Sequence, residues 1–145
     1  MKRKPLAIVY ILLGLILSIL FFSSVSFPVG IEPYFKKSYY GQFGGIAICV
    51  ELIVAGIYLY LNHSKTNFAM ALFAFTALLD PIFNYAGIFS SSVPLYGTII
   101  FIAFAIISFW IAFTNAFDTG KISTFNLIAS LVLGLIVEYF FNPFG

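Results

Sequence analysis

Five long apolar stretches, separated by short polar segments, dominate the sequence. A helix needs roughly 20 apolar residues to cross a bilayer, and each stretch comes close to that length. We predict membrane spans at residues 6–26, 42–61, 67–89, 95–117 and 122–141. The segments between them carry proline, glycine, serine and charged residues, which are typical of loops. The sequence therefore predicts an all-α fold: a polytopic membrane bundle of five transmembrane helices, forming a single transmembrane domain over residues 1–145.

The composition excludes most classes of soluble protein. Only 8% of the residues are charged, whereas soluble globular proteins carry about 25%. The net charge of +2 is too small to indicate nucleic-acid binding. We therefore expect the partners to be the lipid bilayer and either further copies of the chain, as a homo-oligomer, or other membrane subunits, and we expect no nucleic acid.

The amino-terminal stretch shares features with a cleaved secretory signal. It has a basic start, a long apolar segment and small residues at Ser24-Val25-Ser26. However, the apolar segment from Leu6 to Val25 is longer than the roughly 7–15 residues of a signal core. We interpret it as a retained first span, with a cleaved signal as the alternative.

Lysine and arginine predict the orientation, because cytoplasmic loops carry more of both. With a cytoplasmic amino terminus, Lys2, Arg3, Lys4, Lys65 and Lys121 face inside, and only Lys36 and Lys37 face outside. Nine tyrosines fall near the predicted interfaces and suggest an aromatic belt: Tyr34, Tyr39, Tyr40, Tyr85, Tyr96 and Tyr139 outside, with Tyr10, Tyr58 and Tyr60 inside. We predict an integral protein of the cell membrane, with its amino terminus in the cytoplasm and its carboxyl terminus outside.

Two pairs of short segments resemble each other along the chain. YGQFGGIA at 40–47 and YGTIIFIA at 96–103 share their first two and last two residues. DPIFNYAG at 80–87 and EYFFNPFG at 138–145 share the pattern acid-x-x-Phe-Asn-x-x-Gly. These matches suggest a first helix followed by two parallel helical-hairpin repeats, at 40–87 and 96–145, as in some membrane transporters. Chance matching among abundant residues is the competing explanation.

Three acidic residues, Glu51, Asp80 and Glu138, fall within the predicted spans. A charged side chain at the centre of a membrane helix costs about 2.5–3.5 kcal/mol on insertion scales, so such residues are candidates for function. No lysine or arginine lies within the spans to pair with them. Their expected partners are therefore hydroxyls, amides, backbone carbonyls, water or a bound cation.

Residues four apart share one face of a helix, which places polar residues in stripes. The stripes comprise Thr76, Asp80 and Asn84 in the third span and Asn126, Ser130, Gly134, Glu138 and Asn142 in the fifth. Pro81 cannot donate a backbone hydrogen bond, which leaves the Ala77 carbonyl without its helical donor and favours a kink. We predict an ion or proton pathway formed by Glu51, Thr76, Asp80, Asn84 and Glu138.

Structural roles compete with this pathway. Asp80 is equally well explained as a protonated acid that hydrogen-bonds to Thr76 or to a neighbouring helix. For Glu138 we prefer a side chain that reaches the outer headgroups over a buried one.

The lone cysteine and the lone histidine restrict other chemistry. Cys49 lies within a predicted span and is interpreted as a packing thiol, and His63 lies in a predicted loop. A single histidine excludes haem held by paired histidines and a histidine-rich zinc site. We predict no cofactor and no catalytic residue, and these residues leave open whether a metal ion binds.

Three functions are compatible with the pattern, in this order of preference. The first is a small proton- or cation-coupled transporter or channel that uses intramembrane carboxylates. The second is a non-catalytic structural subunit of a larger membrane complex, of the respiratory or secretion type. The third is a carboxylate-based membrane lipid enzyme. The sequence has no Ser-His-Asp set, no Cys-His pair and no phosphate-binding glycine loop, so we expect no enzymatic activity.

Overall fold

The computed structural model describes residues 3–25, 27, 29–35, 43–87, 93–114, 117 and 120–141. These residues form five long helices and no strand: α1 (Arg3–Phe22), α3 (Gly44–Leu61), α4 (Thr66–Tyr85), α5 (Leu95–Phe113) and α6 (Thr124–Phe141). A short 3-10 helix, η1 (Glu32–Phe35), lies between α1 and α3. All five long helices are long and apolar enough to cross a membrane. The prediction of five helices is therefore confirmed within the described ranges.

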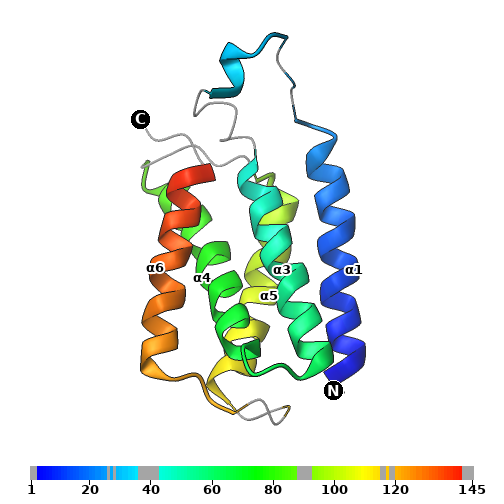
Figure 1. The fold of residues 1–145 in the computed structure, drawn as a ribbon, viewed down its shortest axis with the longest axis vertical. Coiled ribbons are helices and arrows are strands. Elements are labelled where there is room, and N and C mark those ends of the chain that lie inside the picture. The colour runs from blue at the N-terminus through cyan, green and yellow to red at the C-terminus, as the bar shows by residue number, and fades with distance from the viewer. Residues whose placement is uncertain are drawn as a thin grey trace.

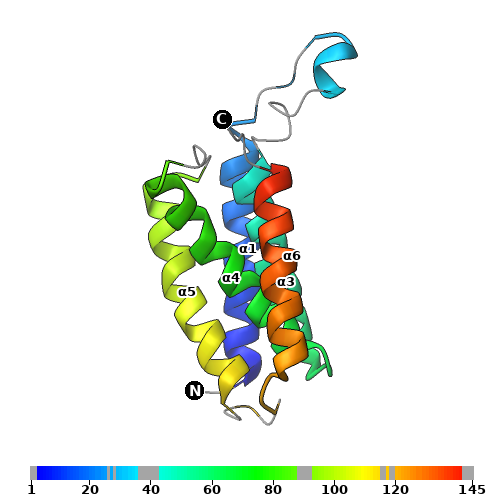
Figure 2. The ribbon, with the colours of Figure 1, turned by 90° about the vertical axis from the view of Figure 1, so that its left-hand side faces the viewer.

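The helices form an elongated bundle in which neighbours along the chain run in opposite directions (Figure 1). α1 packs mainly against α3, whereas α4 contacts α3, α5 and α6. α4 runs obliquely between α5 and α6 (Figure 2). α6 lies at the edge of the bundle, with an extensive interface on α4 and a small one on α3.

The turns at the end of the bundle where α1 begins hold α4 and α6 side by side. α3 stops at Leu61 because Asn62 adopts a left-handed conformation, with φ of 51°. Thr66 then donates its hydroxyl hydrogen to the His63 carbonyl at 2.6 Å. Asn67 Nδ2 donates to the Gly120 carbonyl at 3.0 Å, which joins the start of α4 to the segment leading into α6.

Small residues allow α1 and α3 to approach closely. A Cβ atom at Gly56 would lie 2.8 Å from Tyr10 Cβ and 3.0 Å from the Ala7 carbonyl oxygen. A Cβ atom at Gly14 would lie 2.5 Å from a side-chain carbon of Ile53. Such contacts between small residues let backbones approach in membrane helix pairs. Cys49 is fully buried at this interface as a free thiol, as predicted.

Tyr10 corrects the predicted aromatic belt. Its side chain is fully buried rather than interfacial. The ring packs edge-on against Phe104 of α5, with centroids 5.1 Å apart, and its hydroxyl lies 2.8 Å from Ser108 Oγ. The prediction was wrong because the hydroxyl finds a partner inside the bundle and needs no water or headgroup.

Basic residues gather at one end of the bundle. Arg3 and Lys4 begin α1, Lys65 precedes α4 and Lys121 precedes α6, and all three helices begin at the same end (Figure 1). Several residues used in the predictions lie outside the described ranges: Lys2, Lys36, Lys37, Tyr39, Tyr40 and Asn142, with the span ends at 26, 42, 88–89 and 115–116.

The two predicted hairpins pack differently. α3 and α4 share a direct interface, whereas α5 and α6 have none of comparable size, and α4 lies between them (Figure 2). Residues 40–42 and 142–145 of the matched segments lie outside the described ranges. The sequence repeat therefore stays a prediction.

Candidate functional site

Three carboxyl side chains come together where α3, α4 and α6 meet. They are Glu51 of α3, Asp80 of α4 and Glu138 of α6, three of the five acidic residues in the chain. Asp80 and Glu138 are each only 1% exposed. Glu51 is partly buried as a whole residue, but its Oε2 atom is covered. We refer to these three side chains as the carboxyl cluster.

The close approach of α6 to α4 explains why Glu138 reaches Asp80. The buried residues of α6 are Ser130, Gly134 and Glu138, one turn apart on a single face. A Cβ atom at Gly134 would lie 3.1 Å from Thr76 Oγ1, so α6 contacts α4 at the level of Thr76. One turn further along both helices, Glu138 and Asp80 occupy the same level.

The contacts of Thr76 constrain the protonation of Glu51. Thr76 Oγ1 lies 2.8 Å from the Leu72 carbonyl oxygen and 3.2 Å from Glu51 Oε1. A hydroxyl has one hydrogen and donates to one acceptor at a time. If that hydrogen goes to the nearer Leu72 carbonyl, the contact with Glu51 is a hydrogen bond only when the carboxyl carries a proton. Both contacts are satisfied together by a neutral Glu51.

Asp80 and Glu138 form a second contact with the same requirement. Their carboxyl groups are within side-chain hydrogen-bonding reach of each other, and Glu51 lies within electrostatic range of Glu138. An ionised carboxylate only accepts hydrogen bonds, so two carboxyls can bond to each other only if one holds a proton. The described lysines and Arg3 lie at the helix starts and precede or begin α1, α4 and α6. Among the described residues no basic side chain lies beside the pair, and a contact between two carboxyls requires a shared proton.

Glu51 retains an unused hydrogen-bonding position. Its buried Oε2 atom has no hydrogen-bond partner among the described residues. Buried polar atoms are nearly always paired with protein or with water. With the proton of a neutral Glu51 on Oε1, Oε2 is a buried acceptor at the carboxyl cluster.

Within the described ranges, no group of three or more His, Cys, Asp and Glu side chains is arranged to hold a metal ion. The chemistry that the three carboxyls do offer is the binding, sharing and release of protons.

The structure brings together four of the five residues of the predicted pathway. Glu51, Thr76, Asp80 and Glu138 meet at the carboxyl cluster. Asn84 is exposed, one turn beyond Asp80 near the end of α4.

The preferred interpretation of Glu138 is corrected. We expected it to reach the outer headgroups, but its side chain is buried beside Asp80. Its sequence signal was the stripe in the fifth span that contains Ser130, Gly134 and Glu138. These three residues are buried, and the close packing of Gly134 on α4 places the Glu138 carboxyl beside that helix.

Pro81 is accommodated inside α4, which continues to Tyr85. Because proline has no N–H group, the Ala77 carbonyl lacks its usual helical donor. Ala77 is 1% exposed, so this carbonyl belongs to a buried residue three positions before Asp80. It adds an oxygen acceptor on the same helix as the acid.

Comparisons of the chain with protein-family models, with curated proteins and with solved structures find no match.

Proposed function

We propose that the chain is an integral membrane protein that couples transport to proton binding at the carboxyl cluster. The five apolar helices cross the bilayer, and Asp80, Glu138 and Glu51 take up and release protons inside it. The observation that carries the proposal is the burial of two carboxyls, Asp80 and Glu138, each 1% exposed, on helices that pack against each other. Two carboxyls that bond to each other share a proton.

The coupling follows from what happens when that proton leaves. Two carboxylates without a shared proton repel each other strongly in a low-dielectric interior. The repulsion acts between α4 and α6, which are held together nearby by the contact of Gly134 with Thr76. Loss of the proton therefore favours separation of the two helices at the level of Asp80. Such a change in helix packing is the kind of two-state element that a proton-coupled carrier or channel needs.

The distribution of basic residues supports the proposed orientation. Arg3, Lys4, Lys65 and Lys121 lie at the end of the bundle where α1 begins. Short loops rich in lysine and arginine face the cytoplasm in most membrane proteins. We place this end, with the amino terminus, on the cytoplasmic side of the cell membrane and the carboxyl terminus outside.

Proton flux into liposomes tests the function. The purified protein is reconstituted with an internal pH-sensitive dye, and a potassium diffusion potential drives protons inward. We expect flux above that of empty liposomes for the wild type, and loss of this flux for Asp80→Asn and Glu138→Gln. Glu32→Gln is the matched control, because Glu32 is exposed on η1 outside the carboxyl cluster. Absence of wild-type flux, or equal flux in all variants, would refute the proposal.

A structural subunit of a larger membrane complex is the second candidate. It is favoured by the edge position of α6, which buries only one narrow face. Large apolar residues elsewhere on α6 are uncovered, including Phe125 at 80% and Tyr139 at 62% exposure. Affinity purification of the tagged native protein in mild detergent distinguishes the two candidates. Stoichiometric foreign subunits would favour this one, and a species containing only this chain would favour the transporter.

A further inference from the structure

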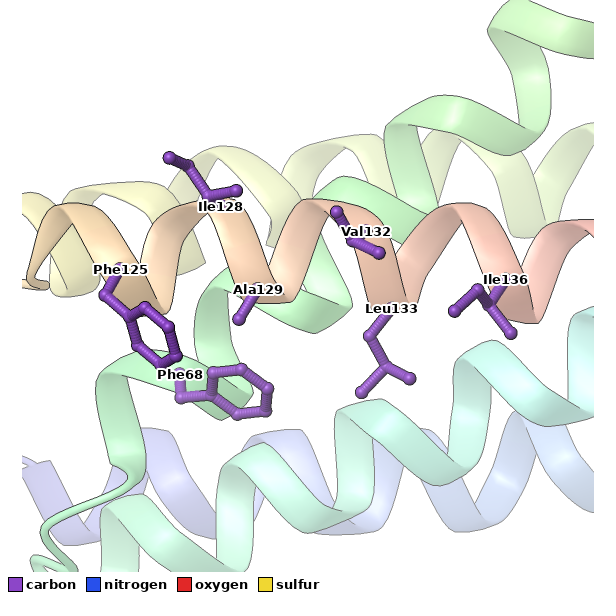
Figure 3. Close-up of a pocket in the computed structure, with 7 residues that line it drawn as sticks. All are labelled: Phe68, Phe125, Ile128, Ala129, Val132, Leu133 and Ile136. Atoms are coloured by element: carbon purple, nitrogen blue, oxygen red, sulfur yellow. The ribbon is translucent and has the colours of Figure 1, made fainter.

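An apolar groove of about 470 Å3 follows the first two thirds of α6 (Figure 3). Phe68 of α4 lies at its base, and apolar side chains of α6 from Phe125 to Ile136 line its length. Ala129 and Leu133 lie on the side of α6 that faces α3 (Figure 3). The groove exists because α6 packs closely on α4 but only slightly on α3.

A smaller cavity continues the groove towards the basic end of the bundle. This cavity, of about 220 Å3, is lined by Lys65, Phe68 and Asn126. Phe68 belongs to both cavities, so the apolar groove opens onto a lysine and an amide. An apolar channel with one basic end matches the shape of an anionic phospholipid, which has an apolar chain and a negatively charged phosphate.

We infer that this groove binds one acyl chain of an anionic phospholipid, with the lipid phosphate held by Lys65 and Asn126. The inference rests on the membrane location proposed above, but it is independent of proton exchange at the carboxyl cluster. The ligand is a lipid of the leaflet at the basic end.

The length of the groove agrees with a chain from one leaflet. From Phe125 to Ile136, α6 rises roughly 16 Å at 1.5 Å per residue. The hydrocarbon core of a bilayer is about 30 Å thick, so the groove extends through about half of it. It begins at the membrane surface where Lys65 lies and ends near the bilayer midplane.

Charge complementarity selects an anionic headgroup. Lys65 is exposed, and no ion pair ties it to a described acid. Of the described acids, Glu51, Asp80 and Glu138 lie inside the bundle, and Glu32 lies near its opposite end (Figure 1). Basic residues at the surface attract anionic lipids, with each lysine contributing about fivefold in affinity.

Native mass spectrometry of the full-length protein tests the site, with phosphatidylglycerol and phosphatidylcholine as competing probes in detergent. We expect one phosphatidylglycerol to bind in preference to phosphatidylcholine. Ala129→Phe fills the groove and should weaken binding about tenfold, equivalent to displacing about two methylene groups. Ile106→Phe is the matched control, because Ile106 is an exposed apolar residue on α5.

A second pair of variants tests the headgroup contact. Lys65→Gln should reduce the preference for phosphatidylglycerol about fivefold while binding of phosphatidylcholine stays unchanged. Lys121→Gln, at the same end but outside the groove lining, should leave the preference intact. Circular dichroism verifies the helical fold of each variant.

Equal losses from Lys65→Gln and Lys121→Gln would show a diffuse surface attraction and overturn the site. Equal binding by the wild type and Ala129→Phe would also overturn it. Asp80→Asn protein that has lost proton flux should still bind phosphatidylglycerol. The lipid site and the proposed function can therefore be refuted independently of each other.

Discussion

The same hydroxyl arrangement occurs at two places in the bundle, with different partners. Between α1 and α5, Ser108 donates to the carbonyl of Phe104 at 2.7 Å and accepts from the hydroxyl of Tyr10. Between α3 and α4, Thr76 contacts the carbonyl of Leu72 at 2.8 Å and the carboxyl of Glu51 at 3.2 Å. Each hydroxyl can donate its hydrogen to the carbonyl four residues earlier in its own helix.

The difference lies in how firmly each partner holds its proton. A phenol keeps its proton at neutral pH, so the contact of Tyr10 with Ser108 is always complete. A carboxyl exchanges its proton. When Thr76 donates to the Leu72 carbonyl, its contact with Glu51 is a hydrogen bond only if Glu51 is protonated. The contact between α1 and α5, which we call the first seam, is therefore a fixed structural contact. The second, which also holds Asp80 and Glu138, changes with proton occupancy.

The largest expected effect comes from removing the ring of Tyr10. Tyr10→Ala leaves a cavity between Phe73 and Phe104, whose rings lie 6.5 Å and 5.1 Å from it. We expect a loss of about 3–5 kcal/mol in the free energy of unfolding, as for other buried aromatic truncations. Unfolding in mixed detergent–SDS micelles, followed by circular dichroism, measures it. A loss below about 1 kcal/mol would show that this seam is not a fixed contact.

The next effect compares a glycine of the α1–α3 interface with a glycine of the α4–α6 interface. Gly56→Ala places a Cβ atom 3.0 Å from the backbone oxygen of Ala7, which cannot move alone. We expect a loss of about 1–3 kcal/mol, typical of overpacking. Gly134→Ala is the counterpart, because its nearest atom is the side-chain oxygen of Thr76 at 3.1 Å.

Gly134→Ala should cost less stability than Gly56→Ala but should reduce proton flux, since Thr76 must shift away from its present contacts. The same unfolding assay and the liposome assay report the two effects. A larger loss of stability in Gly134→Ala than in Gly56→Ala would mean that the α4–α6 interface is the more rigid of the two.

A smaller effect is expected from deleting only the phenol oxygen. Tyr10→Phe keeps the ring but leaves Ser108 without the hydrogen bond from Tyr10. Hydrogen bonds between membrane helices contribute about 0.6 kcal/mol on average and at most about 1.7 kcal/mol. We expect a loss in that range with unchanged proton flux. Reduced flux in this variant would mean that the α1–α5 seam also takes part in transport.

The length of the apolar stretches predicted the helices, because each stretch can be recognised from its own residues alone. The bounds moved by a few residues at most described ends: α1 ends at Phe22 rather than at 26, and α4 ends at Tyr85 rather than at 89. Polar residues become more frequent over several positions at the end of each apolar stretch. The sequence therefore does not specify which residue ends the helix.

The partners of buried polar groups could not be predicted in the same way. Tyr10 was assigned to the interface and Glu138 to the headgroups because each lies near the end of its predicted span. Which side chain faces which neighbour depends on the rotation of each helix in the bundle. The stripe of Ser130, Gly134 and Glu138 gave the buried face of α6, but it did not identify α4 as the helix opposite. Only the packed arrangement brings Asp80 and Glu138 together.

The smallest expected effect on stability, in Glu51→Gln, separates the two seams most clearly. A glutamine amide donates a hydrogen permanently, so it can complete the contact with Thr76 as the neutral carboxyl does. We expect the free energy of unfolding to stay within about 0.5 kcal/mol of the wild type, as for substitutions that break no contact. Proton flux should nevertheless be lost, because the amide cannot release the hydrogen that holds the contact. Tyr10→Phe should show the opposite combination, with lower stability and normal flux. A different result is that Glu51→Gln destabilises the protein as much as Tyr10→Phe and leaves proton flux intact. Glu51 would then be a structural residue like Tyr10, and only Asp80 and Glu138 would exchange protons.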